Sequence, residues 1–159
     1  MKLDAAEASH SDIPTLEDLY QGLEEEMAAL HPMWPLADGL PDPVDKSFGQ
    51  AIEDEDTLVL LGRIDGYPFG FMLVRVEEML NRARGERLAA IRLVYVDPEA
   101  REVGVGEVML QTALERLRSR GISKFDAHVL PGHRLVKNFF EAGGFAARSI
   151  IMHHDDDKG

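Results

Sequence analysis

Apolar positions along the chain follow two periods, and the order of these periods predicts an α/β fold. Short apolar or alternating runs predict strands over residues 2–8, 57–64, 67–76, 88–96, 124–130 and 147–152. Apolar residues spaced by three and four predict helices that start after Ser11-Asp12, near Glu107 and after Pro131-Gly132. This order predicts a mixed, mostly antiparallel central sheet with helices packed on both faces.

The connections between these elements carry signals of their own. Asp65-Gly66 predicts a two-residue hairpin, and residues 81–87 predict a longer exposed hairpin loop. Four prolines between His31 and Asp45 forbid a long helix, so we expect a loop or a broken helical turn there. Trp34 in that stretch either lines a binding pocket or packs as a lid on the core.

Length and composition limit the class of protein. The 159 residues suit one sizeable core, so we expect one domain over residues 1–152 and a polar tail over 153–159. The chain has no cysteine, which excludes disulfides and thiolate metal sites, and we expect no metal. No apolar run approaches the roughly 18 residues of a membrane span, and the N-terminus lacks a signal-peptide pattern. These features predict a cytoplasmic protein that does not bind membranes.

The net charge of −12 is concentrated in the first third of the chain. Residues 1–60 hold 2 basic and 15 acidic residues, whereas residues 61–159 hold 15 basic and 14 acidic ones. This balance argues against nucleic-acid binding, which depends on neutralising phosphates. The acidic segment either attracts a cationic substrate or forms a solvated surface.

The segment Arg101-Glu102-Val103-Gly104-Val105-Gly106 carries the strongest chemical signal. It joins the apolar run that ends in Val96-Asp97-Pro98 to the helix that begins near Glu107. Backbone N–H groups at such a helix start lack partners and face the positive end of the helix dipole, so they suit a phosphate. Glycine also lets a pyrophosphate approach the backbone closely. The segment therefore predicts a phosphate-bearing ligand.

Two motifs narrow the kind of phosphate site. A dinucleotide fingerprint would need glycine where Met109 stands, and a P-loop would need Gly-Lys-Ser/Thr, which the chain lacks. Arg-x-x-Gly-x-Gly after Val-Asp-Pro instead resembles the central motif of the acetyl-CoA-dependent N-acetyltransferase superfamily, usually called GNAT. Residues 139–145 (FFEAGGF) resemble the Phe-Tyr-x-x-x-Gly-Phe helix ending of that family. The resemblance covers roughly residues 88–152 and implies the GNAT fold.

The resemblance also implies where acetyl-CoA would bind. In this family the sheet opens after the central strand, here residues 88–96, and the pantetheine arm bonds to the backbone of that strand. Carried over, the backbone groups would come from Val94 and Val96. The pyrophosphate would rest on the backbone amides of Val103, Gly104, Val105 and Gly106, with added positive charge from Arg101. The last helix would flank the arm with His133, Lys137 and Phe140.

The catalytic groups depart from the family pattern. Acetyl transfer needs an amine that has lost its extra proton, and the thiolate leaving group can need one. The family commonly supplies that proton from a tyrosine, but here the position is Phe140, which has none to give. His128 is the preferred base candidate, because an imidazole titrates in the right range. Tyr95 is the substitute acid candidate, and both side chains have structural roles as alternatives.

Arg92 and Trp34 are the candidate acceptor contacts. Arg92 interrupts the apolar central strand, and an arginine is costly to bury without a partner. It therefore faces solvent or meets a carboxylate, which could belong to the substrate. An acceptor with both an amine and a carboxylate, a peptide N-terminus or a lysine side chain would reconcile Arg92 with the acidic first third.

Two functions follow from these residues. The leading hypothesis is an N-acetyltransferase that moves the acetyl group of acetyl-CoA to a primary amine in a small amine, an amino-acid-like molecule or a peptide. The alternative is a non-catalytic acyl-CoA-binding regulatory module, which Phe140 and Arg92 motivate. Acetyl-CoA is the one cofactor expected, as the acyl donor. Dimers are common in the resembled family, so a homodimer stays open.

Overall fold

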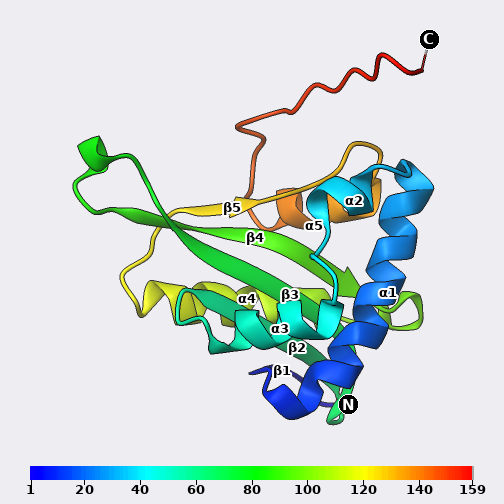
Figure 1. The fold of residues 1–159 in the computed structure, drawn as a ribbon. Helices are drawn as coiled ribbons and strands as arrows, with labels where there is room; N and C mark the ends of the chain where they lie inside the picture. Colours follow the sequence, from blue (N-terminus) through cyan, green and yellow to red (C-terminus); the bar gives the residue numbers. More distant parts are fainter. Residues whose placement is uncertain (159) are drawn as a thin grey trace.

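The computed structural model describes residues 1–158, and its strands form one five-stranded sheet (Figure 1). Across the sheet lie, in chain order, β1 (Leu3–Glu7), β2 (Thr57–Ile64), β3 (Tyr67–Glu78), β4 (Arg87–Val96) and β5 (Phe125–Ala127). β1 to β4 pair antiparallel, whereas β4 and β5 run parallel. The predicted mixed, mostly antiparallel sheet is therefore confirmed.

Helices cover both faces of this sheet, as the sequence predicts. One face carries α1 (Ile13–Leu30) and α3 (Val44–Glu53), with the short α2 (Trp34–Asp38) between them in the chain. The other face carries α4 (Val105–Arg118) and α5 (Arg134–Ala142). Short 3-10 turns occupy loops at His10–Asp12, Asn81–Ala83 and Pro98–Ala100.

Two apolar clusters hold the layers together, one on each face of the sheet. The cluster on the α4 side includes Leu60 and Met109, and the cluster on the α1 side includes Leu16 and Phe48, all fully buried. Residues 71–74 of β3 are all buried, because alternate side chains enter the two clusters. Within residues 1–158 no helix is long and apolar enough to span a membrane, and no three His, Asp or Glu side chains group as a metal site.

The proline-rich stretch contains more helix than the sequence suggests. α2 lies inside the expected loop, and α3 follows it where no helix was expected. Pro35 lies in the first turn of α2, and Pro43 precedes the first residue of α3. Neither position needs the N–H that proline lacks, so these prolines begin helices rather than prevent them.

The expected last strand over residues 147–152 is wrong. These residues form no strand, and the side chains of Ile150, Ile151 and Met152 are 76%, 83% and 88% exposed. The segment runs away from the body of the fold (Figure 1), and Arg148 anchors it by donating from Nε to Asp126 of β5 at 2.7 Å. Strand preference depends on packing against a partner strand, which the composition of one segment does not supply.

Candidate functional site

A bulge in β4 coincides with an opening of the sheet. The register of β3 against β4 shifts by one position, which makes Arg92 an extra residue on β4. β5 pairs with β4 only over Ala89–Ile91, and the His128 N–H donates to the Ile91 carbonyl at 3.0 Å as the two strands separate. From Arg92 onward this edge of β4 faces no strand within residues 1–158. Its backbone is therefore accessible to a ligand, in the place where the sequence predicts an opening.

The turn between β4 and α4 leaves the N-terminus of α4 uncapped. Asp97 accepts the Glu99 N–H at 2.9 Å and so shapes the 3-10 turn that follows β4. Glu102 and Gly104 have φ angles of 67° and 116°, in the left-handed region. Within the described residues 1–158, no side chain caps α4 at Gly104. The first N–H groups of α4 lie at the positive end of its dipole, so this turn can bind an anion.

A groove of about 290 Å³ lies between the open half of β4, the start of α4 and α5, and we call it the β4 groove. Most of the site residues expected from the sequence line it: Val94, Tyr95, Val96, Arg101, Gly104, Val105, Gly106 and His133. A Cβ on Gly106 would lie 3.1 Å from the ring of Phe139, which lines the opposite wall. Glycine at this position therefore lets the Phe139 ring approach the start of α4 closely.

Three of the expected ligand contacts do not line the β4 groove. Val103 is absent from its walls, and Lys137 is exposed and pairs with Glu141 at 3.1 Å. The side chain of Phe140 is 3% exposed and packs in the core against its neighbour Phe139. Successive side chains of a helix point in different directions, and in α5 it is Phe139 that faces the groove.

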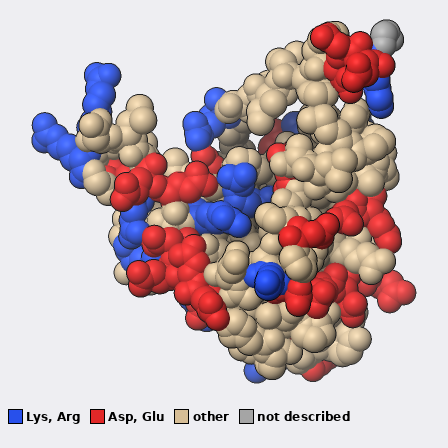
Figure 2. Space-filling view, in the orientation of Figure 1, with Lys and Arg blue, Asp and Glu red and all other residues tan. Residues whose placement is uncertain are grey.

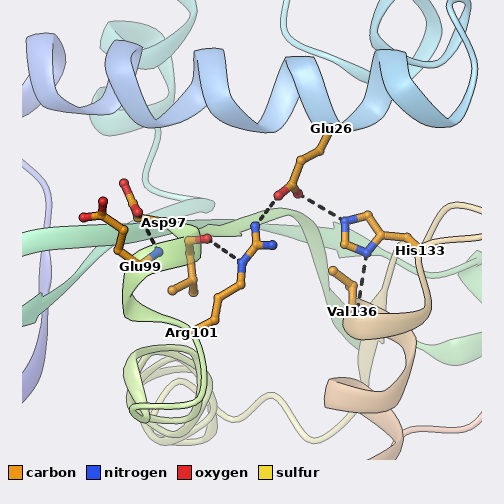
Figure 3. A network of polar contacts seen from close by, with 7 residues as sticks. Glu26, Asp97, Glu99, Arg101, His133 and Val136 are labelled. Atoms are coloured by element: carbon orange, nitrogen blue, oxygen red, sulfur yellow. Dashed lines mark hydrogen bonds and ion pairs between the residues drawn. The ribbon is translucent and has the colours of Figure 1, made fainter.

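A polar network crosses the β4 groove from α1 to α5 (Figure 3). Arg101 donates from Nε to the Val96 carbonyl at 2.9 Å and from Nη2 to Glu26. The other carboxylate oxygen of Glu26 lies 3.3 Å from His133 Nε2, and His133 Nδ1 accepts the Val136 N–H at the start of α5. Because Nδ1 accepts a hydrogen bond, the proton of the neutral ring lies on Nε2 and faces Glu26.

Sequence reasoning did not single out Glu26 of α1, although its carboxylate contacts both Arg101 and His133 in the β4 groove. Burial works to raise the pKa of its carboxyl, but the hydrogen bonds from His133 and Arg101 outweigh burial and lower that pKa. Glu26 is therefore ionised and engages the arginine expected to meet a phosphate. In the sequence it is one of three consecutive glutamates, residues 24–26. It differs from the other two only in the direction in which its side chain leaves α1.

Tyr95 reaches from β4 to α1 and rests on Gly22. A Cβ on Gly22 would lie 2.6 Å from Tyr95 Cζ, so glycine alone leaves room for the ring. The Arg101 guanidinium lies 5.6 Å from the ring centroid, within the range of a cation–π contact. Burial, followed by the charges of Glu26 and Asp97, raises the pKa of the phenol. Tyr95 is therefore protonated at neutral pH and is able to donate a proton.

His128 follows β5 at the point where the sheet opens. Its side chain is accessible, yet the surrounding protein removes part of its water. This desolvation, together with the positive charge of Arg92, lowers the pKa of His128 against the opposing charges of Glu77, Asp126 and Asp38. The lowered pKa keeps the ring neutral at pH 7, and the neutral ring is the form that accepts a proton.

Arg92 and Trp34, the expected acceptor contacts, lie in different surroundings. Arg92 is exposed, lies 3.6 Å from Glu77 and lines a second cavity on the α1 face of the sheet. Trp34 lines neither the β4 groove nor this cavity. Its ring stacks on His31 with 4.3 Å between centroids, meets His153 at 5.5 Å and packs against the α1 cluster. Trp34 therefore has the packing role that the sequence left as its alternative.

Known acetyltransferases match the chain in sequence pattern and in fold. Residues 16–145 match the family model described as the acetyltransferase (GNAT) family. A ribosomal-protein-alanine N-acetyltransferase from Brucella melitensis biovar Abortus 2308 is 18% identical with a TM-score of 0.72, over 97% of this chain and 100% of that one. AAC(6')-Iy, in complex with the bisubstrate analogue CoA-S-monomethyl-acetylneamine, is 16% identical with a TM-score of 0.72, over 98% of this chain and 99% of that one. A tetramutant of the BH1408 protein from Bacillus halodurans is 14% identical with a TM-score of 0.83, over 98% and 99% of the two chains. No curated protein matches the chain.

Proposed function

Because the chain belongs to the GNAT acetyltransferase family, we propose that it transfers the acetyl group of acetyl-CoA to the primary amine of an acceptor. The observation that carries this proposal is the β4 groove, which joins an unpaired strand edge to a helix N-terminus that no side chain caps. The similar fold of AAC(6')-Iy, which was solved with a CoA-based bisubstrate analogue, supports the assignment of the groove to the acyl donor.

The residues of the β4 groove fit acetyl-CoA. The N–H groups of Val105 and Gly106, at the start of α4, would hold the pyrophosphate, with the positive charge of Arg101 beside them. The pantetheine arm would bond to the backbone of Val94 and to the N–H of Val96, since the Val96 carbonyl already accepts the hydrogen bond from Arg101. On the α5 side His133 and Phe139 would flank the arm, because both line the groove.

The proposed chemistry moves one acetyl group to the acceptor nitrogen and removes two protons from that nitrogen. The acceptor arrives as an ammonium ion with a pKa of about 10.4, so a base must take a proton before its nitrogen can attack. We assign this role to the neutral ring of His128 at the opening of the sheet. A C–N bond forms to the acetyl carbon while the C–S bond breaks, and its electron pair stays on sulfur. After the attack the nitrogen still carries one proton more than the amide product, and this second proton passes to solvent. Tyr95 donates the proton that turns the thiolate into a thiol. Solvent then takes the proton of His128 and reprotonates Tyr95.

A non-catalytic acyl-CoA-binding module is the competing function, and Phe140 favours it. The family commonly uses a tyrosine acid at that position, whereas Phe140 has no proton and lies in the core. Binding of acetyl-CoA without release of CoA thiol, across a broad panel of amines, would support this alternative. Turnover that falls when Tyr95 is replaced by phenylalanine would exclude it.

Gly106→Glu tests the donor site, with Gly106→Ala as its matched control. Both substitutions add the same Cβ next to Phe139, but only glutamate places a carboxylate where the pyrophosphate would lie. An acidic residue in the first turn of a helix is favourable, and Gly106→Ala has the same contact with Phe139, so loss of binding in Gly106→Glu alone would not follow from unfolding. Calorimetric titration with acetyl-CoA should show affinity at least about 100-fold weaker for Gly106→Glu than for Gly106→Ala. Equal affinities would remove the phosphate site from this turn.

A further inference from the structure

We infer that the acceptor is an amine that also carries a carboxylate, and that Arg75 and Arg92 bind this carboxylate. The inference rests on the proposed acetyl transfer and names the chemical class of its acceptor. The second cavity, of about 200 Å³, would hold the acceptor, and we call it the arginine cavity. Its walls come from the end of α2 and the following loop, residues 38–40, and from β3 and β4.

The bulge in β4 brings the two arginines to one face of the sheet. In a regular strand Arg92 and Leu93 would point to opposite faces. The extra residue turns both toward the α1 side, where Leu93 joins the apolar cluster and Arg92 lines the cavity. Arg75 comes two residues after Leu73 on β3, so it lies on the same face. Figure 2 shows basic side chains over β3 and β4 in the middle of this face, with acidic side chains around them.

Both guanidinium groups of the arginine cavity have free donor groups. Arg75 forms no ion pair within residues 1–158, and Arg92 meets only Glu77, at the long distance of 3.6 Å. A guanidinium presents planar, paired N–H donors that match a carboxylate. Asp38, across the same cavity, also has no ion-pair partner in the described part of the chain. Its charge suits the ammonium group of the same molecule, so the cavity is complementary to a zwitterion.

The apolar side chains in its lining distinguish the arginine cavity from an ordinary charged surface. Leu40, Leu73 and Leu93 line it together with the arginines, and Leu73 and Leu93 belong to the buried cluster under α1. A carboxylate held over such a floor loses part of its water, which strengthens its attraction to the guanidinium groups. The arginine cavity therefore has the mixed polar and apolar lining that is usual for a small-molecule site.

The arginine cavity and the β4 groove use successive residues of β4 as part of their walls, where the sheet opens. Leu93 lines the cavity, and the next residue, Val94, lines the groove. His128 lies near this part of β4, because its backbone N–H donates to the carbonyl of Ile91, the residue before Arg92, at 3.0 Å. An acceptor with its carboxylate on the arginines can therefore extend its amine toward His128. An acceptor of this class also matches both charges of the protein: its carboxylate suits the two arginines of the cavity, and its amine suits the acidic first third of the chain.

Paired substrates and paired variants test this inference. The substrates are the common α-amino acids and the straight ω-amino acids from glycine to 6-aminohexanoate, each compared with its carboxamide in an acetyl-CoA-dependent thiol-release assay. The variants are Arg75→Gln and Arg92→Gln, with Arg82→Gln on the exposed hairpin loop as the control. For the best acid we expect kcat/KM at least about tenfold above that of its amide, and each cavity variant should reduce this preference to about twofold or less. Turnover of the amides should change less than about twofold in these variants.

Calorimetric titration of the free protein with the same compounds separates the inference from the proposed function. Binding of an acid but not of its amide, lost in Arg75→Gln and Arg92→Gln, would support the carboxylate site even if no compound were acetylated. Turnover of amides as fast as acids, or a preference that persists in both variants, would overturn the inference and leave the acetyl transfer intact. Absence of both acid binding and acid turnover across the panel would also overturn it.

Discussion

The arginine cavity and the β4 groove, which both use β4 as a wall, differ in how many parts of the chain build them. The β4 groove takes much of its wall from one nearly continuous stretch, residues 94–107, with additions from α5 and from Glu26. The arginine cavity combines three short stretches, residues 38–40, 73–75 and 92–93. A continuous stretch keeps its shape through local hydrogen bonds, whereas the cavity depends on how a loop packs over two strands. Substitutions should therefore affect donor binding and acceptor turnover separately.

His128→Ala should produce the largest effect, and on the acceptor side alone. Loss of a general base lowers kcat/KM by about 10²- to 10⁴-fold, while acetyl-CoA affinity should stay unchanged because His128 lies outside the β4 groove. Since the pKa of His128 is lowered, the wild-type kcat/KM should hold at neutral pH and fall only below about pH 6.5. The variant should lose this dependence. His10→Ala, at an exposed histidine paired with Glu53, is the control, and an unchanged pH profile in His128→Ala would contradict the assignment.

Gly22→Ala tests the contact that joins α1 to β4. The new methyl group would overlap the ring of Tyr95, so the free energy of unfolding should fall by about 1–3 kcal/mol in urea titrations. Gly49→Ala on α3 is the matched control, because its Cβ would find its nearest neighbour at 3.8 Å. That substitution should raise the free energy of unfolding by about 0.5–1 kcal/mol, as alanine is the better helix former. Equal effects of the two substitutions would mean that Tyr95 does not rest on α1.

The proposed acetyl-CoA site could be predicted from the sequence because the features that it requires lie close together in the chain. A left-handed turn that needs Gly104, a glycine at Gly106 and a helix with a clear apolar stripe all lie within one short segment. The opening beside β4 was predicted too, but only through the resemblance to a family. The bulge at Arg92, which coincides with the opening, leaves no pattern that distinguishes it from a single charged residue in a strand.

The acceptor side could not be predicted in this way, because distant segments build it. Arg75 is one polar position near the end of β3, and its neighbours Asp38 and Arg92 come from other parts of the chain. Glu26 differs from the two glutamates before it only in its direction on α1. The two phenylalanines of the FFEAGGF motif show the same limit. The motif predicted the position of α5 in the chain, but it did not predict that Phe139 faces the groove while Phe140 is buried.

Glu26→Gln and Arg101→Gln should change acetyl-CoA affinity in opposite directions. Removal of the Glu26 charge frees Arg101 and takes a carboxylate out of the groove, so the Kd should fall by about 3- to 10-fold. Arg101→Gln removes the cation and should raise the Kd about tenfold. Both variants lose the same ion pair, whose side chains are 26% and 25% exposed, so similar losses of stability serve as the internal control. Weaker binding in both variants would show that Glu26 positions Arg101 for the ligand rather than competing for it.

Glu102→Gly should give the smallest effect and separates local geometry from overall charge. Glu102 has a φ of 67°, which costs a non-glycine residue roughly 1 kcal/mol, so glycine should raise the Tm by about 2–4 °C. The substitution also removes a carboxylate that lines the β4 groove, and acetyl-CoA should bind about two- to threefold more tightly.

Asp65→Gly is the matched control, because Asp65 has a φ of 49° and the same charge but lies in the hairpin turn between β2 and β3. It loses the hydrogen bond from the Lys2 N–H, so its gain in Tm should be smaller, and its acetyl-CoA affinity should not change. If both variants bound acetyl-CoA equally more tightly, the acidic surface as a whole, rather than the turn before α4, would control access of the donor.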